Sequence, residues 1–492
     1  MRRLSNRIRK RKISANTSRP CGSLVHLKQT YYLPIHYSQK SALNLIVDSV
    51  LTNAKAYLNM EIVDCSIAIE NGKIFKIGKE THMPSADEKI NLKNLLVLPG
   101  LIDVHVHLRD EGKAYKEDFY TGTAAAAAGG LTTVLDMPNN APVTMSVETL
   151  KNRMRIAERS ILVNVGFFSE FPNDLGEISE IVAQGAVGFK LFMACQVGGL
   201  NVDDDEALRE AFTKVSELGV PVTVHAEDKA LLMENKEKLK RSKRYDAKAF
   251  LMAHTERVEL KAVERLLKLS AHTGVRVHFC HMTTKEGLKV VVEAKKSGRK
   301  VTCEVTPQHL LLSKSDFKRH GLMLTMMPPL RSESHIKALW KGIANGWLDA
   351  LASDHAPHAL SEKSASSVWD VKVGMPGLET TLPLMLTLVR KNRISLTHVV
   401  SLLSEKPAEI FNLKDRSRLE HGRKADLTVV DFNSKFRIDA SKFHSKAKYS
   451  PFDGWEVQGK PVKTFVNGLL IMDEQEIVAK AGSGALIGRE RA

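Results

Sequence analysis

The middle of the chain alternates short apolar segments with longer amphipathic ones. Each apolar segment is rich in β-branched and aromatic residues and is bounded by turn-forming residues, which is typical of a buried strand. Between these segments, apolar and charged residues recur at helical spacing, for example over 204–219 and 256–274. The predicted barrel strands are 101–107, 132–137, 162–168, 186–193, 220–227, 276–282, 300–306 and 349–355.

Such strand and helix repeats predict an α/β fold with a (β/α)8 TIM-like barrel, in which functional residues lie at the C-terminal ends of the strands. A doubly wound open sheet is the alternative. No GxGxxG or Walker-type loop follows any predicted strand, so the sequence favours the barrel.

Both flanks of this region carry strand-like patterns punctuated by Gly and Asn-Gly turns. Each flank is short for an independent domain, so we expect the two to join in one smaller composite β-sandwich domain. The predicted organisation is a basic tail over 1–42, a β domain built from 43–98 and 413–492, and the barrel over 99–412.

The net charge of +16 is concentrated at the N-terminus. Residues 1–40 hold ten Lys or Arg and no Asp or Glu, which leaves +6 for the remainder. We interpret this segment as a disordered or non-native tail, with an organelle transit peptide and a nucleic-acid-binding arm as alternatives. No apolar run approaches the roughly 18 residues of a spanning helix. The five cysteines lack CxxC spacing, which favours a reduced compartment, the cytoplasm.

Ionisable residues stand at the C-terminal ends of several predicted strands. His105 and His107 alternate along one strand, so their side chains share a face and can reach one ion. Imidazole nitrogen and carboxylate oxygen are ordinary ligands of Zn²⁺. A single strand-end histidine is often only a buried core residue, but a whole set at matching strand ends predicts a metal site. The set is His105, His107, Lys190, His225, His281 and Asp354.

Lys190 is the unusual member, because an ammonium is repelled by metal cations. A salt-bridged or snorkelling lysine is the simpler interpretation. The surrounding segment AVGFKLFM is apolar, however, and burial there favours the neutral amine. A neutral amine can react with CO₂ to give a carbamate, whose two oxygens can bridge two metal ions.

The motifs HVHLR, GFKLF, VHAE, FCHMT and SDHAPH, in this order and spacing, resemble those of the amidohydrolase superfamily. Within it they are most similar to dihydroorotases with a carboxylated lysine, over Leu43 to Ile477. The resemblance implies two Zn²⁺ per chain, bridged by N6-carboxylated Lys190. It also implies that His105, His107 and Asp354 hold one ion and that His225 and His281 hold the other.

Two such ions, about 3.5 to 4 Å apart, can share a hydroxide and polarise a carbonyl oxygen. The metal-bridging hydroxide would attack a ring amide. Asp354 would take the hydroxide's proton as general base and return it to the leaving nitrogen as general acid. The expected chemistry is reversible hydrolysis of a cyclic amide.

Hydantoinases, dihydropyrimidinases and allantoinases resemble this sequence in the same metal residues. The substrate contacts must therefore determine which cyclic amide is bound. Dihydroorotate carries a ring carboxylate that hydantoin and allantoin lack, and a guanidinium suits it. The resemblance implies that Arg109, Asn139 in DMPNN and His358 in SDHAPH hold this carboxylate. Val373 and Gly374 are weaker candidates for backbone contacts to the ring.

Several positions depart from the family pattern. Met327 stands where relatives have Asn or Arg, so one substrate contact is missing or supplied elsewhere. The loop ACQVGGLNVDDD lacks the Thr-Phe pair of the animal enzyme, although its two glycines could hinge a lid. Cys280 and Glu304 match positions that hold an additional zinc in the animal enzyme. A buried core cysteine and a glutamate supporting the metal ligands are equal alternatives.

The resemblance therefore implies a zinc-dependent dihydroorotase, which interconverts N-carbamoyl-L-aspartate and L-dihydroorotate in de novo pyrimidine biosynthesis. The alternatives are an allantoinase, dihydropyrimidinase or hydantoinase, and an inactive homologue that acts as a scaffold. We expect a small-molecule substrate and no membrane. A nucleic-acid role rests on the tail alone, and a homo-oligomer or association with other pyrimidine-pathway enzymes is left open.

Overall fold

Parallel strands form a nearly closed barrel in the computed structural model, which describes residues 46–413 and 415–488. The strands pair in chain order, and the last returns to the first through a parallel bridge between Val106 and His355. The predicted (β/α)8 barrel is thus confirmed. Its strands are β6 (Leu101–Val106), β7 (Leu131–Asp136), β8 (Asn164–Ser169), β9 (Ala186–Phe192), β10 (Pro221–His225), β11 (Arg276–Phe279), β12 (Val301–Val305) and β13 (Ala350–Leu351).

Helices follow the barrel strands and cover the outside of the barrel. Polar side chains fix where several of them begin: Asp118 accepts a hydrogen bond from the backbone N–H of Thr121, and Asp204 accepts two from the first turn of its helix. In chain order the helices are α1 (Phe119–Ala128), α2 (Val147–Glu158), α3 (Ile178–Ala183), α4 (Asp205–Leu218), α5 (Lys229–Arg241), α6 (Ala247–Ala253), α7 (Glu256–Thr273), α8 (Lys285–Lys296), α9 (Pro307–Leu311), α10 (Phe317–His320), α11 (Glu333–Ala344), α12 (Leu378–Arg390), α13 (Leu396–Val400) and α14 (Lys406–Ile410).

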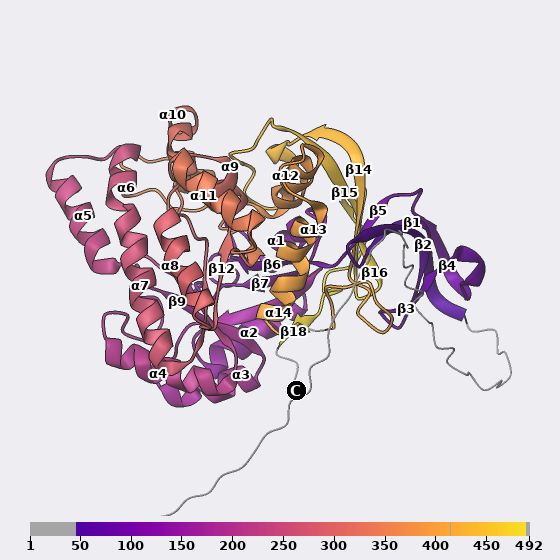
Figure 1. Cartoon of the computed structure of the whole chain (residues 1–492), viewed down its shortest axis with the longest axis horizontal. Helices are drawn as coiled ribbons and strands as arrows, with labels where there is room; N and C mark the ends of the chain where they lie inside the picture. Colours follow the sequence, from indigo (N-terminus) through magenta and orange to yellow (C-terminus); the bar gives the residue numbers. More distant parts are fainter. Residues whose placement is uncertain (1–45, 414, 489–492) are drawn as a thin grey trace, which may run out of the picture. The chain divides into compact units, whose positions relative to one another are not determined.

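The apolar character of the strands follows from burial on both of their faces. Every residue of β6, β7 and β8 is buried, because one face points into the barrel and the other is covered by helices. Helices α4, α7, α8 and α11 pack against one another in succession (Figure 1). The polar strand-end residues are therefore held on a rigid frame.

The two flanks of the barrel meet in one further sheet. Strand β5 pairs with β14 in antiparallel register, from Leu427 opposite Pro99 to Val430 opposite Leu96. This pairing confirms a smaller β domain built from both flanks. The sheet order is β17-β16-β15-β14-β5-β1-β2-β3, with β4 beside β1. The strands are β1 (Ile46–Leu58), β2 (Glu61–Glu70), β3 (Lys73–Gly78), β4 (Ser85–Asn91), β5 (Leu96–Pro99), β14 (Leu427–Arg437), β15 (Glu456–Val466), β16 (Leu469–Asp473) and β17 (Glu476–Ile477).

The last described strand, β18 (Leu486–Ile487), pairs with β8 of the barrel and not with the β domain. Glycines permit this return of the chain. A Cβ at Gly484 would lie 2.2 Å from the backbone oxygen of Val163. The segment predicted as 413–492 is therefore shared between the β domain and the barrel.

The predicted basic tail over 1–42 lies outside the described residues. Within the described part, no helix has the length and apolarity needed to span a membrane.

Candidate metal centre

A cavity of about 240 Å³ opens among the residues that follow the barrel strands. Residues predicted separately as metal ligands and as substrate contacts line it together. Lys190 is fully buried on β9 and does not line the cavity. The predicted residues that line it are His105, His107, His225, His281, Asp354, Arg109, Asn139, His358, Val373 and Gly374.

His105, His107 and Asp354 form a compact buried group. The Nε2 atoms of the two histidines lie 3.5 and 3.4 Å from Oδ1 of Asp354. Ligand atoms at about 2.0 to 2.1 Å from a tetrahedral Zn²⁺ are separated by roughly 3.3 to 3.4 Å. Burial lowers the pKa of both histidines, which leaves neutral imidazoles with lone pairs. The spacing and chemistry of this donor set fit a divalent metal ion.

Glu304 on β12 supports His105 from behind. Its Oε1 lies 2.6 Å from Nδ1 of His105, and its Oε2 lies 3.0 Å from Nε2 of His278. Glu304 also accepts the backbone N–H of His281 at 3.1 Å. Contact with Nδ1 leaves Nε2 of His105 directed toward Asp354. These contacts match the supporting role, although His105, Cys280 and Glu304 also lie close enough together to hold an ion.

His225 and His281 form the second group of imidazoles. Nδ1 of His225 lies 3.1 Å from Nε2 of His281, and Nδ1 of His281 is buried without a hydrogen-bond partner among the described residues. Glu227 holds Nε2 of His225 at 2.9 Å and Nδ1 of His254 at 2.7 Å. Contact with these histidines outweighs burial and holds the pKa of Glu227 well below its usual range. An ionised Glu227 makes His225 donate from Nε2, so Nδ1 keeps its lone pair.

Glu227 and His254 also belong to this group, although neither was predicted from the sequence. Glu227 stands two residues after His225 in VHAE, a spacing that could have suggested a supporting carboxylate. His254 comes from the region after α6, and no local pattern connects it to the strand ends.

Lys190 has a thiol and an aromatic ring as its nearest partners, and Asp354 and Glu170 act on it from beyond ion-pair distance. Its Nζ lies 3.0 Å from Sγ of Cys280 and 4.9 Å from the centre of the Phe192 ring. Within the described residues it forms no ion pair with a carboxylate, which argues against the salt-bridged interpretation. Cys280 is thus the neighbour of Lys190, and its thiol is buried.

The residues predicted to hold a substrate carboxylate converge on one side of the cavity. Arg109 is buried, with its guanidinium 3.3 Å from the backbone oxygen of Pro357 and 3.3 Å from Nε2 of His358. No carboxylate in the described part of the chain pairs with it. Oδ1 of Asn139 lies 2.7 Å from Nδ1 of His107, so this residue joins the metal group to the substrate side.

The proton positions on His358 follow from its partners. The ammonium of Lys116 lies 3.0 Å from Nδ1, so Nδ1 accepts. Nε2 lies 3.0 Å from the backbone oxygen of Val373 and donates to it, so the guanidinium of Arg109 at 3.3 Å is a close contact and not a hydrogen bond. Burial, followed by repulsion from Arg109, lowers the pKa of His358 to about 2. His358 is a neutral hydrogen-bond donor on the substrate side.

A buried lysine that the sequence analysis missed fixes the loops beside the cavity. Nζ of Lys363, at the end of a short helical turn (Leu360–Lys363), donates to the backbone oxygens of Thr325, Lys372 and Gly374 at 3.0 to 3.1 Å. Gly374 has a φ of 133°, and a Cβ there would lie 2.5 Å from the backbone oxygen of Ala356. Only glycine suits this position next to the cavity.

The two glycines expected to hinge a lid are explained by close packing. A Cβ at Gly198 would lie 2.6 Å from Oε2 of Glu170, and one at Gly199 would lie 2.5 Å from the backbone nitrogen of Asn173. The loop after Lys190 rests on the segment that follows β8. Met327 lines the cavity, where it offers a thioether and no hydrogen-bond donor.

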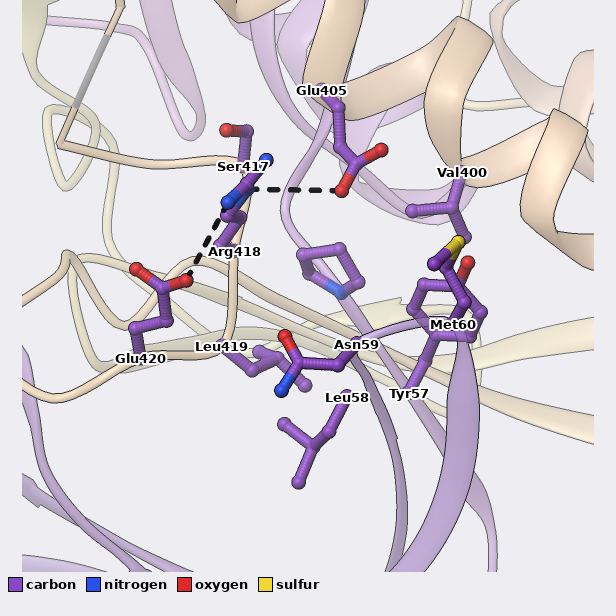
Figure 2. Close-up of a pocket in the computed structure, with 11 residues that line it drawn as sticks. Tyr57, Leu58, Asn59, Met60, Val400, Glu405, Ser417, Arg418, Leu419 and Glu420 are labelled. Atoms are coloured by element: carbon purple, nitrogen blue, oxygen red, sulfur yellow. Dashed lines mark ion pairs between the residues drawn. The ribbon is translucent and has the colours of Figure 1, made fainter. Parts of the chain in front are cut away.

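A second cavity, of about 300 Å³, lies between the end of β1 and the loop over 417–420. Figure 2 shows Arg418 between Glu405 and Glu420, with ion-pair distances of 3.7 and 3.8 Å. Its lining contains no histidine or cysteine. Its charges satisfy one another, so it does not resemble the donor group at the strand ends.

A barrel with imidazole and carboxylate groups clustered at its strand ends defines the class of metal-dependent barrel hydrolases. The chain belongs to the amidohydrolase family, whose sequence profile matches residues 96–471.

Individual relatives agree with this assignment. The chain is 38% identical over 449 residues to a dihydroorotase of Methanosarcina acetivorans. The alignment covers 89% of this chain and 95% of that protein. The chain is 40% identical over 428 residues to a dihydroorotase of Methanothermobacter thermautotrophicus, covering 86% and 94%. The solved structure of an L-hydantoinase (dihydropyrimidinase) from Arthrobacter aurescens matches with a TM-score of 0.86 and 32% identity, over 90% of this chain and all of that one.

Proposed function

We propose that this chain is a dihydroorotase, a cyclic amide hydrolase that interconverts L-dihydroorotate and N-carbamoyl-L-aspartate in pyrimidine biosynthesis. The observation that carries the proposal is Arg109, a buried cation beside the metal group with no carboxylate partner among the described residues. A buried unpaired charge is costly, and the ring carboxylate of dihydroorotate would neutralise it. Hydantoin and dihydrouracil offer no such group. Similarity to two archaeal dihydroorotases supports the same choice.

The proposed cofactor is a pair of Zn²⁺ ions bridged by N6-carboxylated Lys190. When bound, such ions lower the pKa of water and polarise a carbonyl oxygen. Within the described residues no ion pair occupies the Lys190 amine, which supports its assignment as the carrier of the carbamate. The proposed ligands are His105, His107 and Asp354 for one ion, and His225 and His281 for the other.

Asp354 is the proposed proton carrier. Burial raises the pKa of its carboxyl group, and His105 opposes that shift. In ring opening, its carboxylate takes a proton from the attacking water as a C–O bond forms at the ring carbonyl. It then gives the proton to the ring nitrogen as the C–N bond breaks. Ring closure follows the reverse course.

Arg109 and His358 would orient the ring. The guanidinium would pair with the carboxylate, and the Nε2–H of His358 would donate to it in place of Val373. Asn139 already holds His107 through Oδ1, so its side-chain NH₂ remains to donate to substrate. Val373 and Gly374 would meet the pyrimidine ring through backbone groups.

The proposal is tested by assaying the purified, zinc-loaded chain on several rings. We expect turnover of dihydroorotate and of N-carbamoyl-L-aspartate, and little or none of hydantoin, dihydrouracil or allantoin. Activity confined to the uncharged rings would instead identify a hydantoinase-like or allantoinase-like enzyme. The likeness to the L-hydantoinase structure is what makes this comparison necessary.

An inactive scaffold homologue is the alternative from another class. Metal analysis distinguishes it, because a scaffold needs neither metal nor turnover. About two zinc ions per chain together with activity would reject it.

For location and partners, we propose a cytoplasmic enzyme whose partner is a small-molecule substrate. The scattered cysteines support a reduced compartment. A targeting role for the basic tail, self-association and association with other pyrimidine-pathway enzymes stay predictions.

A further inference from the structure

Cationic side chains surround the substrate side of the cavity in excess of what the carboxylate contact needs. Arg109 and Lys372 line the cavity, and Lys372 is exposed. Lys113 is half-buried and donates from Nζ to the backbone oxygen of Asn139 at 2.6 Å. Lys116 completes the group through its contact with His358.

One ion pair joins this group, and Asp354 and Asp136 act on Arg109 from beyond ion-pair distance. Glu362 pairs with Lys116 at 2.8 Å. Within residues 46–413 and 415–488, neither Lys113 nor Lys372 has an ion-pair partner. Burial, followed by repulsion from Arg109 and Lys116, lowers the pKa of Lys113. The group therefore repels itself and carries a surplus of positive charge.

The backbone of Lys372 is fixed although its side chain is exposed. Its N–H donates to the backbone oxygen of Glu362 at 2.9 Å, and its carbonyl accepts from the buried amine of Lys363 at 3.1 Å. The neighbouring residues Val373 and Gly374 line the cavity. The side chain of Lys372 thus starts from a fixed backbone position beside the cavity.

We propose that Lys113 and Lys372 are substrate-binding residues that strengthen binding of the open-chain, doubly charged substrate more than binding of its ring form. This inference rests on the proposed function. N-carbamoyl-L-aspartate has two carboxylates, whereas dihydroorotate has one. Arg109 accounts for the carboxylate that both compounds share, and the second carboxylate forms at the ring carbonyl beside Asp354. The two lysines act on the total charge of the ligand through their electrostatic field. Because Coulomb interaction scales with ligand charge, the logarithm of their effect on binding should be about twice as large for the dianion.

The test measures KM in both directions for the zinc-loaded wild type, Lys372→Glu, Lys113→Met and the control Lys300→Glu. Lys300 is exposed and precedes β12, at the end of the barrel opposite the cavity, so Lys300→Glu makes the same charge change far from substrate. Assays run from about 10 mM to about 0.3 M salt, over which screening shortens from roughly 30 Å to below 10 Å.

At low salt we expect Lys372→Glu to raise KM about tenfold for N-carbamoyl-L-aspartate and about threefold for dihydroorotate. Lys113→Met removes one charge without reversing it. Its increases in KM should therefore be smaller than those of Lys372→Glu, and again larger for N-carbamoyl-L-aspartate than for dihydroorotate. The differences should shrink at high salt. The reaction equilibrium fixes the ratio of the kcat/KM values for the two directions. If KM rises more for N-carbamoyl-L-aspartate than for dihydroorotate, kcat for N-carbamoyl-L-aspartate must rise relative to kcat for dihydroorotate by the same factor. This relation checks the measurements.

Equal changes in the two KM values, or changes in Lys372→Glu no larger than in Lys300→Glu, would overturn this inference while leaving the dihydroorotase proposal standing. If the wild type turns over neither compound, the proposed function itself fails and the inference falls with it. Unchanged values in Lys113→Met beside altered ones in Lys372→Glu would overturn the part assigned to Lys113.

Discussion

Arg109 follows His105 and His107 and has a φ of 65°, an uncommon conformation for a residue other than glycine. Its guanidinium contacts a backbone oxygen and an imidazole, but no acid among the described residues. Such a charge lowers stability in the free protein and is useful only when an anion arrives. This argues for a substrate-binding role and against a structural one.

Arg109→Met should lower kcat/KM for dihydroorotate about 100- to 1000-fold, because it removes one side of a buried charge pair that forms only with substrate. Zinc content should stay at the wild-type value. The ligand-free variant should be at least as stable as wild type in thermal unfolding, since an unpaired buried cation is lost. A stability loss of several kcal/mol together with lost metal would indicate a structural role for Arg109 instead.

Lys190→Ala should abolish turnover, because it removes the amine on β9 that would carry the proposed bridging carbamate. Small carboxylic acids added to the variant should restore part of the activity by replacing the carbamate. Metal analysis and rescue assays measure this, with a non-carboxylate salt at the same ionic strength as the control. Unaltered turnover in Lys190→Ala would refute the bridging role.

At the scale of elements, the loops after β12 and β13 meet through one buried amine. Lys363 donates to backbone oxygens of both loops, and the N–H of Gly374 donates to the backbone oxygen of Thr325 at 2.9 Å. Without Lys363, the carbonyl groups of Lys372 and Gly374 would lose this donor, whereas that of Thr325 would keep the N–H of Gly374. Lys363 therefore positions Val373 and Gly374 beside the cavity without touching it.

Lys363→Met should raise KM for dihydroorotate about tenfold and change kcat less, because the loops that meet the ring lose their shared anchor. Unsatisfied buried carbonyls should also cost about 1 to 3 kcal/mol in the free energy of unfolding. Steady-state kinetics and denaturant unfolding measure the two effects, with zinc content as the control. Unchanged KM with reduced stability would mean that Lys363 acts only on the fold.

At the scale of the whole molecule, two acids join the barrel to the β domain, the buried Glu117 and the half-buried Glu379. Glu379 at the start of α12 accepts the backbone N–H groups of His444 and Ser445, at 3.1 and 3.2 Å. Glu117, before α1, accepts the N–H of Lys446 at 3.3 Å and lies 3.2 Å from Nε2 of His355, the residue after Asp354. The β domain thus supports the segment that carries the proposed proton carrier.

Burial raises the pKa of Glu379 from 4.5 to about 8. The folded protein then keeps this carboxyl protonated while the unfolded chain ionises it, so stability falls as pH rises from about 4.5 to about 8. Glu379→Gln has no proton to lose there. The stability of the variant relative to wild type should therefore increase by roughly 1 to 3 kcal/mol between pH 5 and pH 8.5, as measured by thermal unfolding. A pH-independent difference would contradict the shifted pKa.

The sequence by itself determined the barrel strands, the residues at their ends and the resemblance that connects them. These features are local, because strand alternation places His105 and His107 on one face and apolar runs mark buried strands. Arg109 and Asp354 could be found for the same reason, since each stands next to such a run.

Only the tertiary structure decided which groups support those residues. Glu304 reaches His105 across 199 positions of sequence, and Lys363 reaches Thr325 across 38. Strand register and loop packing create these contacts, and neither has a local signature. The pairing of β18 with β8 also has no local signature, because two residues with ordinary strand character could pair with either sheet. The chemistry of the site could be predicted from neighbours in sequence, whereas its support depends on neighbours in space.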